Sequence, residues 1–563
     1  MIISRCIDNR TIYTSWRENG EKKVAVELFA PYFYLPENAN EPTHYKIGRA
    51  TTRPFRYERG EWVNLQGEKL KRVYVEQSTD IYNAKKMWPK TYEADVPYHF
   101  RYAVDKIDEM PEYKLRKWYW DMEWQQGGEY HDCITTIVAY DNYDEKYYQW
   151  VWWPEDSTEK DLADVILEGN ICPPSNCIIG FHSSEEAMIK SFIKTMTDKD
   201  PDMLIAWFGN FADIPMLLKR CCALGINPTA LSPIGRVEGI KKTSKGFEYT
   251  KGDEGFSSIQ QPIGGRITLN LDHAFERQWN DSQRGTLPSL ALDYVSSILF
   301  GEGKSKETKF ADPNEFYRRA WLEDTKNYLD YALQDVKLLV KIDETNFCSE
   351  AIVSLQRLLK APFDACFFAS HMGSIYFMRN AWWKAPTGKK VEKREEYDGA
   401  MIYDPLSEQT QGLHLNVAAF DFAGLYPSMM ISRNISWETK SEEPTEFAVN
   451  ILTPRDFSEV KHEKMLYYKT DKLGLLPKAV LELKELRNEY KALLKEARTN
   501  GNEEEAIKWN NNQMAVKRLM ASFYGIVAFQ GFGWADVSLA ASITASAREA
   551  IRLAAFKAKE MNI

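Results

Sequence analysis

Two acidic residues stand two positions apart in an aromatic segment near residue 120. The segment WYWDMEW contains Asp121 and Glu123. Successive side chains of a β-strand point to opposite faces, so both carboxylates share one face while Trp120 and Met122 take the other. Close carboxylates repel each other and lose hydration on burial, and a divalent cation offsets both penalties. The pair therefore indicates a metal site; the alternative is an edge strand with two solvated acids.

Two other segments carry an acid in a recognisable pattern. Asp213 follows an apolar stretch that ends near Gly209 and precedes a helical pattern, so taken alone it is a helix N-cap. Tyr331 and Asp335 are four residues apart in KNYLDYALQDVKLLVKI, which places them on one face of a predicted helix. Taken alone, that segment is an amphipathic helix with an ordinary polar face.

Together the three segments resemble the exonuclease motifs of the DnaQ-like proofreading nucleases. Those enzymes carry D-x-E on a first strand, a distal Asp after a second strand and Y-x-x-x-D on a late helix. The resemblance implies two-metal hydrolysis, with two Mg²⁺ or Mn²⁺ ions about 3.5–4 Å apart and Tyr331 orienting the attacking water. The metal ligands that it implies are Asp121, Glu123, Asp213 and Asp335.

The second exonuclease motif departs from the family pattern at two positions. Phe208 stands where the family usually has Asn, and Ala212 stands where it usually has Phe. Asn210 and Phe211 lie close by, in a shifted register. The ligand Asp213 is retained, so the departure concerns the positioning of the substrate strand.

A second constellation lies in the string AAFDFAGLYPSMM. Asp421 ends an apolar strand pattern, where it can bind Mg²⁺ with help from the Phe422 carbonyl. The chain then turns, so that backbone N–H groups of Leu425 and Tyr426 can meet a triphosphate. The string resembles motif A of the family-B DNA polymerases, D-F-x-S-L-Y-P-S, with Gly424 in place of Ser. The resemblance implies that the Tyr426 ring packs under the sugar and excludes a 2′-hydroxyl; the alternative is a strand followed by a proline turn.

The string KRLMASFYGIVAF resembles motif B of the same family, K-x-x-x-N-S-x-Y-G. Lys517, Ala521 and Tyr524 have the spacing that places them on one helix face. The resemblance implies that Lys517 contacts triphosphate oxygens and that Tyr524 and Gly525 abut the nascent base pair. Ala521 replaces the usual Asn, which removes one polar contact.

Two further features match the family. Arg487 and Lys491 are four residues apart and correspond to its pair of triphosphate-binding cations; a solvated helix face is the alternative. The string YDGA resembles the Y-x-G-G/A loop that guides the primer between two active sites. It implies DNA contacts by Tyr397, Gly399 and Ala400.

The elements that must position these residues form several domains, because a single core rarely exceeds about 250–300 residues and the chain has 563. Short β-runs come first, alternating strand and helix patterns follow, and two long helical patterns are separated by TNG, with Asn502 as N-cap. The expected class is α+β multidomain with family-B polymerase architecture: an N-terminal β-rich domain, a DnaQ/RNase H-like 3′–5′ exonuclease, a partial palm, two-helix fingers and no thumb. The expected boundaries are 1–112 for the N-terminal domain, 113–345 for the exonuclease, 346–383 for a helical segment linking back to the N-terminal domain, 384–470 for the first part of the palm, 471–530 for the fingers and 531–563 for a palm helix.

Three local patterns make sharper structural expectations. Residues 133–140, CITTIVAY, have the apolar character of a central strand. Residues 236–266 are rich in Gly, Lys, Thr and Ser and predict an exposed hairpin, at the place where the family carries an exonuclease hairpin. Residues 416–422, NVAAFDF, predict a strand.

Composition excludes several classes. The chain has 72 basic and 81 acidic side chains and a net charge of −9, so DNA contacts must come from local patches. No apolar run approaches the ~20 residues that span a bilayer, and the N-terminus has no signal-peptide pattern. The eight cysteines form no CxxC pair, which favours reduced thiols. A protein of the prokaryotic or virus-infected cytoplasm is expected.

The family places a D-T-D pair and a thumb after motif B. Here the acids beyond motif B are Asp536, Glu549 and Glu560, without D-x-D spacing. The resemblance thus implies the large piece of a split or truncated polymerase, whose open palm sheet exposes an apolar edge. A stand-alone exonuclease with a DNA-binding polymerase half is the alternative, and a non-catalytic scaffold is disfavoured by the retained acids. Expected partners are primer–template DNA, dNTPs, a second polypeptide with motif C and thumb, and a sliding clamp.

Overall fold

The computed structural model shows two compact units. It describes residues 1–47, 51–125, 127–153, 174–252, 254–281, 285–304, 310, 313–401, 412–413, 415, 417 and 421–561. The first unit comprises Met1–Phe29, Glu109–Val353 and Pro362–Asp364, and the second comprises Ala30–Asp108, Ser354–Ala361 and Ala365–Ile563. Residues 1–29 therefore pack with the first unit, although the sequence groups them with residues 30–112. No helix in the described part of the chain is long and apolar enough to cross a membrane.

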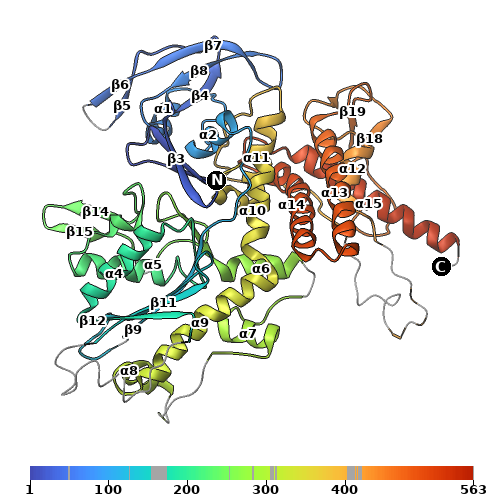
Figure 1. The fold of residues 1–563 in the computed structure, drawn as a ribbon. Helices are drawn as coiled ribbons and strands as arrows, with labels where there is room; N and C mark the ends of the chain where they lie inside the picture. Colours follow the sequence, from blue (N-terminus) through green and yellow to red (C-terminus); the bar gives the residue numbers. More distant parts are fainter. Residues whose placement is uncertain are drawn as a thin grey trace. The chain divides into compact units, whose positions relative to one another are not determined.

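The first unit is built around a six-stranded mixed sheet (Figure 1). The strand order is β12-β11-β10-β9-β13-β16, so the strand with the paired acids, β9, is an inner strand. β9 and β11 pair antiparallel with β10, whereas β13 pairs parallel with β9 and β16. The strands are β9 (Lys117–Trp124), β10 (Ile134–Asp141), β11 (Lys146–Trp152), β12 (Cys177–His182), β13 (Met203–Ala206) and β16 (Ile267–Asn270).

The two faces of β9 differ as the alternation of the sequence predicts. Trp120 and Met122 belong to a buried apolar cluster that includes Phe192 of α4 (Glu185–Lys199). The Trp120 and Phe192 rings are stacked, with centroids 6.0 Å apart. The opposite face lies against α9, which contacts β9 and β10. The edge-strand alternative is wrong, and the predicted central strand at 133–140 is confirmed as β10.

Further elements of the first unit follow the sheet. A hairpin of β14 (Ile240–Thr243) and β15 (Gly246–Tyr249) confirms the prediction for residues 236–266. The helices are α5 (Asp213–Ala223), α6 (Leu271–Asp281), α7 (Leu292–Phe300), α8 (Pro313–Glu323), α9 (Thr325–Asn346) and the start of α10 (Cys348–Leu359).

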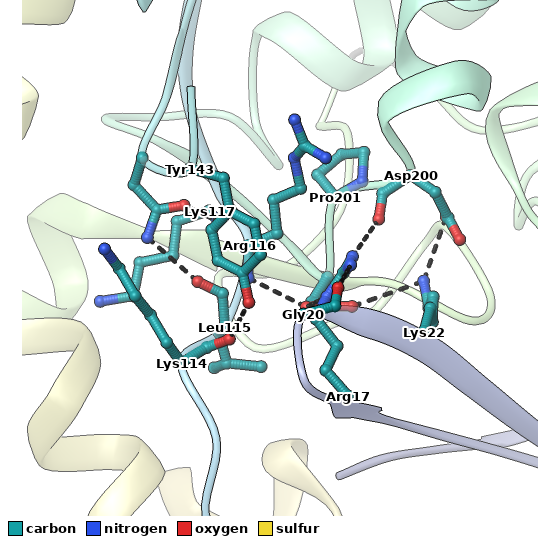
Figure 2. A network of polar contacts seen from close by, with 12 residues as sticks. Arg17, Gly20, Lys22, Lys114, Leu115, Arg116, Lys117, Tyr143, Asp200 and Pro201 are labelled. Carbon is teal, nitrogen blue, oxygen red and sulfur yellow. Dashed lines mark hydrogen bonds and ion pairs between the residues drawn. The ribbon is translucent and has the colours of Figure 1, made fainter. Parts of the chain in front are cut away.

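Ion pairs attach the N-terminal strands to the first unit. These strands, β1 (Ile2–Arg5), β2 (Thr11–Glu18) and β3 (Glu21–Leu28), form a sheet of their own. Figure 2 shows Arg17 and Lys22 reaching from this sheet toward Asp200, at the end of α4. Arg17 Nε lies 2.5 Å from Asp202 Oδ2, and both side chains are buried. Arg17 also donates to the Asp200 carbonyl over 2.7 Å, and Lys22 Nζ lies 3.1 Å from Asp200 Oδ1.

The second unit begins with a β-rich part. Strands β4, β8 and β7 form one antiparallel sheet, and β5 pairs with β6. Phe33, Tyr45, Val73 and Trp88 are among the buried residues of its core. The elements are β4 (Tyr32–Pro36), β5 (His44–Ile47), β6 (Thr51–Pro54), β7 (Arg56–Val63), β8 (Lys69–Tyr74), α1 (Ile81–Ala84) and α2 (Tyr98–Lys106).

Long helices dominate the rest of the second unit. α13 and α14 pack side by side (Figure 1). Asn502 caps α14 as predicted, because its side chain accepts the Glu505 N–H over 3.2 Å. The predicted strand at 416–422 lies mostly outside the described residues, and Asp421 and Phe422 are in no strand. The elements are α11 (Ala369–Asn380), α12 (Leu425–Ser432), β17 (Lys440–Ser441), β18 (Phe447–Asn450), β19 (Met465–Tyr468), α13 (Leu475–Thr499), α14 (Glu503–Ala528) and α15 (Val537–Glu560).

The buried pair predicts a large effect of Arg17→Met. Removing one partner leaves Asp202 buried with less compensation, and breaking a buried pair costs about 3–5 kcal/mol. The exposed pair of Lys23 and Glu21 is the control, because Lys23→Met should cost under about 1 kcal/mol. Chemical denaturation measures both free energies of unfolding. Equal losses for the two variants would contradict the role given to Arg17.

Candidate functional site

The structure brings three of the predicted exonuclease acids together in the first unit. Ligand oxygens of Asp121, Glu123 and Asp335 all lie within 4.8 Å of one another. Two come from one face of β9, and the third comes from α9, which packs against that face. Three carboxylates at this spacing are the oxygen donor set that Mg²⁺ and Mn²⁺ prefer, so the residues fit the implied metal.

Asp213 completes the acidic group from a third element. It is the first residue of α5, and Ala212 is the N-cap, so the interpretation of Asp213 as a cap is wrong. Its side chain is buried and close enough for its charge to raise the pKa of Asp121. A hydrogen bond from the backbone of Met122 ties it to β9. The four acids therefore converge from β9, α5 and α9.

Burial and mutual repulsion make ionisation of these acids costly. The pKa of Asp121 is raised well above its usual value by burial and then by the charges of Asp213 and Glu123. Burial, with the charge of Asp335, raises the pKa of Glu123 to about 8. Burial raises the pKa of Asp213 to about 7. A bound cation removes much of this cost, which agrees with the donor set.

One cation of the chain already faces the acids. Lys304 Nζ hydrogen-bonds to Asp335 Oδ2 and, over 2.9 Å, to the Tyr331 hydroxyl. Burial lowers the pKa of Lys304, but the negative charges of Asp335 and Asp121 have the larger effect, so its pKa is raised overall. The backbone N–H of Lys304 donates to Asp293 Oδ1 over 2.7 Å, which fixes its place. Sequence reasoning missed Lys304, because a lysine 31 residues from its partner carries no local signal.

Two exposed aromatic rings lie in the segment that precedes Asp213 in the sequence. Phe208 and Phe211, in the segment between β13 and α5, are 42% and 41% exposed, with ring centroids 6.3 Å apart. Asn210 is buried instead, and its side chain donates to the carbonyls of Ser257 and Gln260 over 2.9 Å. The altered motif thus presents two rings, where the family has one Asn and one Phe.

A second site gathers tyrosines from three of the predicted polymerase segments, all in the second unit. The Tyr397 and Tyr524 hydroxyls are 2.9 Å apart. The Tyr426 and Tyr524 rings have centroids 4.7 Å apart. The Y-x-G-A loop, motif A and motif B therefore meet at Tyr524. Burial raises the pKa of Tyr426, so its hydroxyl stays protonated at neutral pH.

Motif A forms the turn that its sequence predicts. Gly424 has a φ of +70° immediately before α12, a conformation that glycine adopts without strain and serine does not. Asp421 is exposed, and residues 418–420 lie outside the described part of the chain. Leu425 and Tyr426 begin α12, so their N–H groups lie at a helix N-terminus.

The predicted triphosphate cations lie on α13 and α14. Lys517 and Ala521 are exposed on α14, one turn apart, while their neighbours are buried. Arg487 Nε donates to Gln513 Oε1 over 3.2 Å, which links α13 to α14, and burial lowers the pKa of Arg487. Lys491 is exposed, one turn further along α13.

A buried arginine of α15 holds the predicted primer loop. Arg548 donates over 2.6 Å to the carbonyls of both Asp398 and Gly399 and over 2.7 Å to that of Thr453. The Thr544 hydroxyl donates to the Asp398 carbonyl over 2.7 Å. Sequence reasoning missed Arg548, because nothing in a helical pattern marks an arginine that faces inward.

Acids after motif B already have other partners. Asp536 caps α15 through the Ser538 N–H and pairs with Lys440. Glu549 Oε2 lies 3.0 Å from Arg433 Nη2.

The chain was compared with known proteins. Residues 369–561 match the family model "DNA polymerase family B", and residues 155–280 match "DNA polymerase family B, exonuclease domain". A DNA polymerase of Pyrococcus glycovorans is 26% identical over 95% of the chain, and DNA polymerase 1 of Pyrococcus abyssi is 27% identical over 95%. The chain spans 65% of the length of each of these relatives. The family B DNA polymerase structure from Pyrobaculum calidifontis has a TM-score of 0.68 at 17% identity, covering 99% of this chain and 71% of that one.

The fold and the motifs define a polymerase-type chain with an exonuclease domain. The chain belongs to family B of the DNA polymerases, and its multidomain α+β architecture is that of the family. The resemblance inferred from the sequence is thereby confirmed. The individual residue roles and the domain boundaries remain predictions.

The electrostatics predict that Asp121→Asn stabilises the metal-free first unit. The folded state binds more protons than the unfolded state at this site, so the wild-type chain loses stability as pH rises above the ordinary aspartate pKa. The variant should unfold about 2–4 °C higher in EDTA at pH 8, with a smaller difference at pH 5. Asp198→Asn, at an exposed position of α4, is the control. Scanning calorimetry measures both, and a lower transition for Asp121→Asn would contradict the prediction.

Proposed function

We propose that this chain is the large, exonuclease-bearing part of a proofreading DNA polymerase. The observation that carries the proposal is the convergence of Asp121, Glu123, Asp213 and Asp335 in a unit that accompanies polymerase motifs A and B. Its substrates would be DNA with a 3′ end and deoxynucleoside triphosphates. Family membership supports the class of reaction, and the site chemistry supports the residues.

In the exonuclease site, the four acids would hold Mg²⁺ or Mn²⁺. When bound, such ions stabilise developing negative charge and lower the pKa of water. Tyr331, whose pKa is raised mainly by burial, stays protonated and would orient the attacking water. Lys304, which bonds to Tyr331 and Asp335, would place positive charge beside the scissile phosphodiester. The products would be a nucleoside monophosphate and a strand shortened from its 3′ end.

Phe208 and Phe211 would select single-stranded ends. Exposed rings provide stacking surfaces for unpaired bases, and such stacking contributes about 1–3 kcal/mol per base. A paired end cannot offer its base face without melting. The rings thus support a preference for frayed or mismatched termini, as proofreading requires.

In the polymerase site, Asp421 would hold a metal ion, with the Phe422 carbonyl beside it. Tyr426 would exclude a 2′-hydroxyl, and Tyr524 with Gly525 would abut the new base pair. Lys517, Lys491 and Arg487 would bind the triphosphate; the first two are exposed, and the third is half-buried. The loop with Tyr397, Gly399 and Ala400 would contact the primer.

A second polypeptide would supply the remaining polymerase carboxylates and a thumb. Within the described residues, Asp536 and Glu549 pair with Lys440 and Arg433, and the metal ligand that we assign to this half-site is Asp421. An apolar strip on α15 supports such a partner, because Leu553 and Phe556 are 60% and 45% exposed. A sliding clamp would be a further partner.

A stand-alone exonuclease is the second candidate. The assignment of a single carboxylate, Asp421, to the polymerase half-site favours this candidate, since one carboxylate cannot complete a two-metal site. In that case the second unit would bind DNA without synthesis. The two candidates differ in whether any partner restores extension.

The exonuclease assignment predicts the result of a double substitution. Asp121→Ala with Glu123→Ala should abolish Mg²⁺-dependent 3′→5′ degradation of single-stranded DNA, because metal-ligand oxygens are lost, while DNA binding persists. Glu186→Ala with Asp198→Ala, both exposed on α4, is the matched control. End-labelled oligonucleotides resolved on gels report degradation. Full activity in the acidic-site variant would rule out these ligands.

The polymerase assignment predicts that the 563-residue chain extends primers poorly. Losing part of a metal clamp removes several kcal/mol of transition-state stabilisation, or about 10³-fold in rate. Adding a protein that carries a D-T-D hairpin and a thumb should restore extension, and Leu553→Asp with Phe556→Asp should weaken that rescue. Primer extension with and without the added protein is the measurement. Normal synthesis by the isolated chain would contradict the half-site.

A further inference from the structure

The segment of residues 384–400 has no helix or strand, yet it is fixed to the second unit at three places. Its residues 389–396 are all exposed. Ordering an exposed segment costs about 1–2 kcal/mol of backbone entropy per residue. Specific contacts must offset that cost, and they lie at the beginning, the middle and the end of the segment. We call this segment the linker.

The beginning of the linker is fastened to the β-rich part. The Thr387 N–H donates to the Thr91 carbonyl over 2.9 Å, and the Thr387 hydroxyl accepts the Ala94 N–H over 3.0 Å. The Gly388 N–H donates to Asp95 Oδ2 over 3.0 Å. The end of the linker is held by Arg548, through the carbonyls of Asp398 and Gly399 described above.

The middle of the linker is held by a single side chain. Gln530 Oε1 accepts the Glu395 N–H over 2.8 Å, and Gln530 Nε2 donates to the Glu395 carbonyl over 2.6 Å. The amide thus satisfies both backbone groups of one residue, as a neighbouring strand would. The next residue, Gly531, has a φ of +97°, and a Cβ there would come within 2.9 Å of the Lys389 carbonyl oxygen. The turn at Gly531 therefore packs directly against the backbone of the linker, with no room for a side chain.

Gln530 follows the end of α14, the helix that carries motif B. α14 ends at Ala528, and the Phe529 N–H still donates to the Gly525 carbonyl over 3.0 Å. Tyr524 on the same helix turn meets Tyr397 hydroxyl to hydroxyl. The C-terminal end of α14 and the residues after it therefore contact the linker at two points. The Gln530 amide bonds to the backbone of Glu395, and the Tyr524 hydroxyl bonds to that of Tyr397.

We propose that Gln530 is a positioning residue that couples the C-terminal turn of α14 to the linker and so holds Tyr397 in register with Tyr524. A displacement of this turn then carries the primer loop with it. The inference rests on the proposed polymerase site for its functional meaning, whereas the coupling itself is a property of the chain alone.

The chemistry of the side chain makes the proposal specific. Gln530→Glu keeps an acceptor for the Glu395 N–H but loses the donor to its carbonyl. Gln530→Met keeps the length and loses both hydrogen bonds. The Glu395 backbone N–H should therefore stay protected from hydrogen exchange in Gln530→Glu and lose that protection in Gln530→Met.

Hydrogen exchange of the full chain, without DNA, tests the coupling. In Gln530→Met, the peptide containing Glu395 and Tyr397 should exchange about tenfold faster, because each lost bond contributes about 0.5–1.5 kcal/mol. Exchange in α14 should stay as in the wild type, and Gln530→Glu should lie between the two. Gln66→Met, at an exposed glutamine of the same unit, is the matched control. Unchanged exchange at the linker, or faster exchange throughout α14, would overturn the proposal.

Binding of primer–template DNA then tests the consequence. With Ca²⁺ to prevent cleavage, Gln530→Met should raise Kd about threefold to tenfold, while single-strand degradation in Mg²⁺ stays within about twofold, because the acids lie in the other unit. Lys517→Ala reports separately on the proposed polymerase site. If Lys517→Ala has no effect on dNTP-dependent tightening of the DNA complex, the proposed site fails while the exchange result still decides the coupling. An unchanged Kd for Gln530→Met, with Lys517→Ala impaired, would overturn the positioning role.

Discussion

Repulsion among buried and partly buried carboxylates is the constraint on which the first unit depends. Burial raises the pKa values of all four acids, and neighbouring acids of the group raise those of two of them further. The unit must therefore hold them together against an electrostatic cost. The four acids are Asp121, Glu123, Asp213 and Asp335. The aromatic cluster behind β9 and the long helix α9 supply that rigidity. Lys304 offsets part of the charge from within the chain. The ionised carboxylates therefore carry an electrostatic cost in the metal-free site, and a bound cation would lower that cost.

The second site is organised differently. Its single described motif A carboxylate, Asp421, is exposed, and its tyrosines associate through hydroxyl and ring contacts rather than through charge. Its loop is held by backbone carbonyls that accept from Arg548, a buried guanidinium.

Sequence reasoning was strongest where periodicity and chemistry coincide. The alternation in WYWDMEW identified the acidic face, and the helical spacing of Tyr331 and Asp335 identified the face that meets it. It could not place Lys304 or Arg548, whose importance lies in partners distant along the chain. It also grouped residues 1–29 with the following strands, because ion pairs between residues about 185 positions apart have no local pattern.

The pairing of Arg17 with Asp202 has a consequence for how the chain matures. Residues 1–29 leave the ribosome before their binding partner, because Asp202 is synthesised 185 residues after Arg17 and the 30–108 segment of the other unit emerges in between. Contacts of such high sequence separation slow folding, and unpaired strand edges are aggregation-prone in the meantime. The edge strand β3, with its exposed Val24, Val26 and Leu28, is an apolar edge that stays open during this interval.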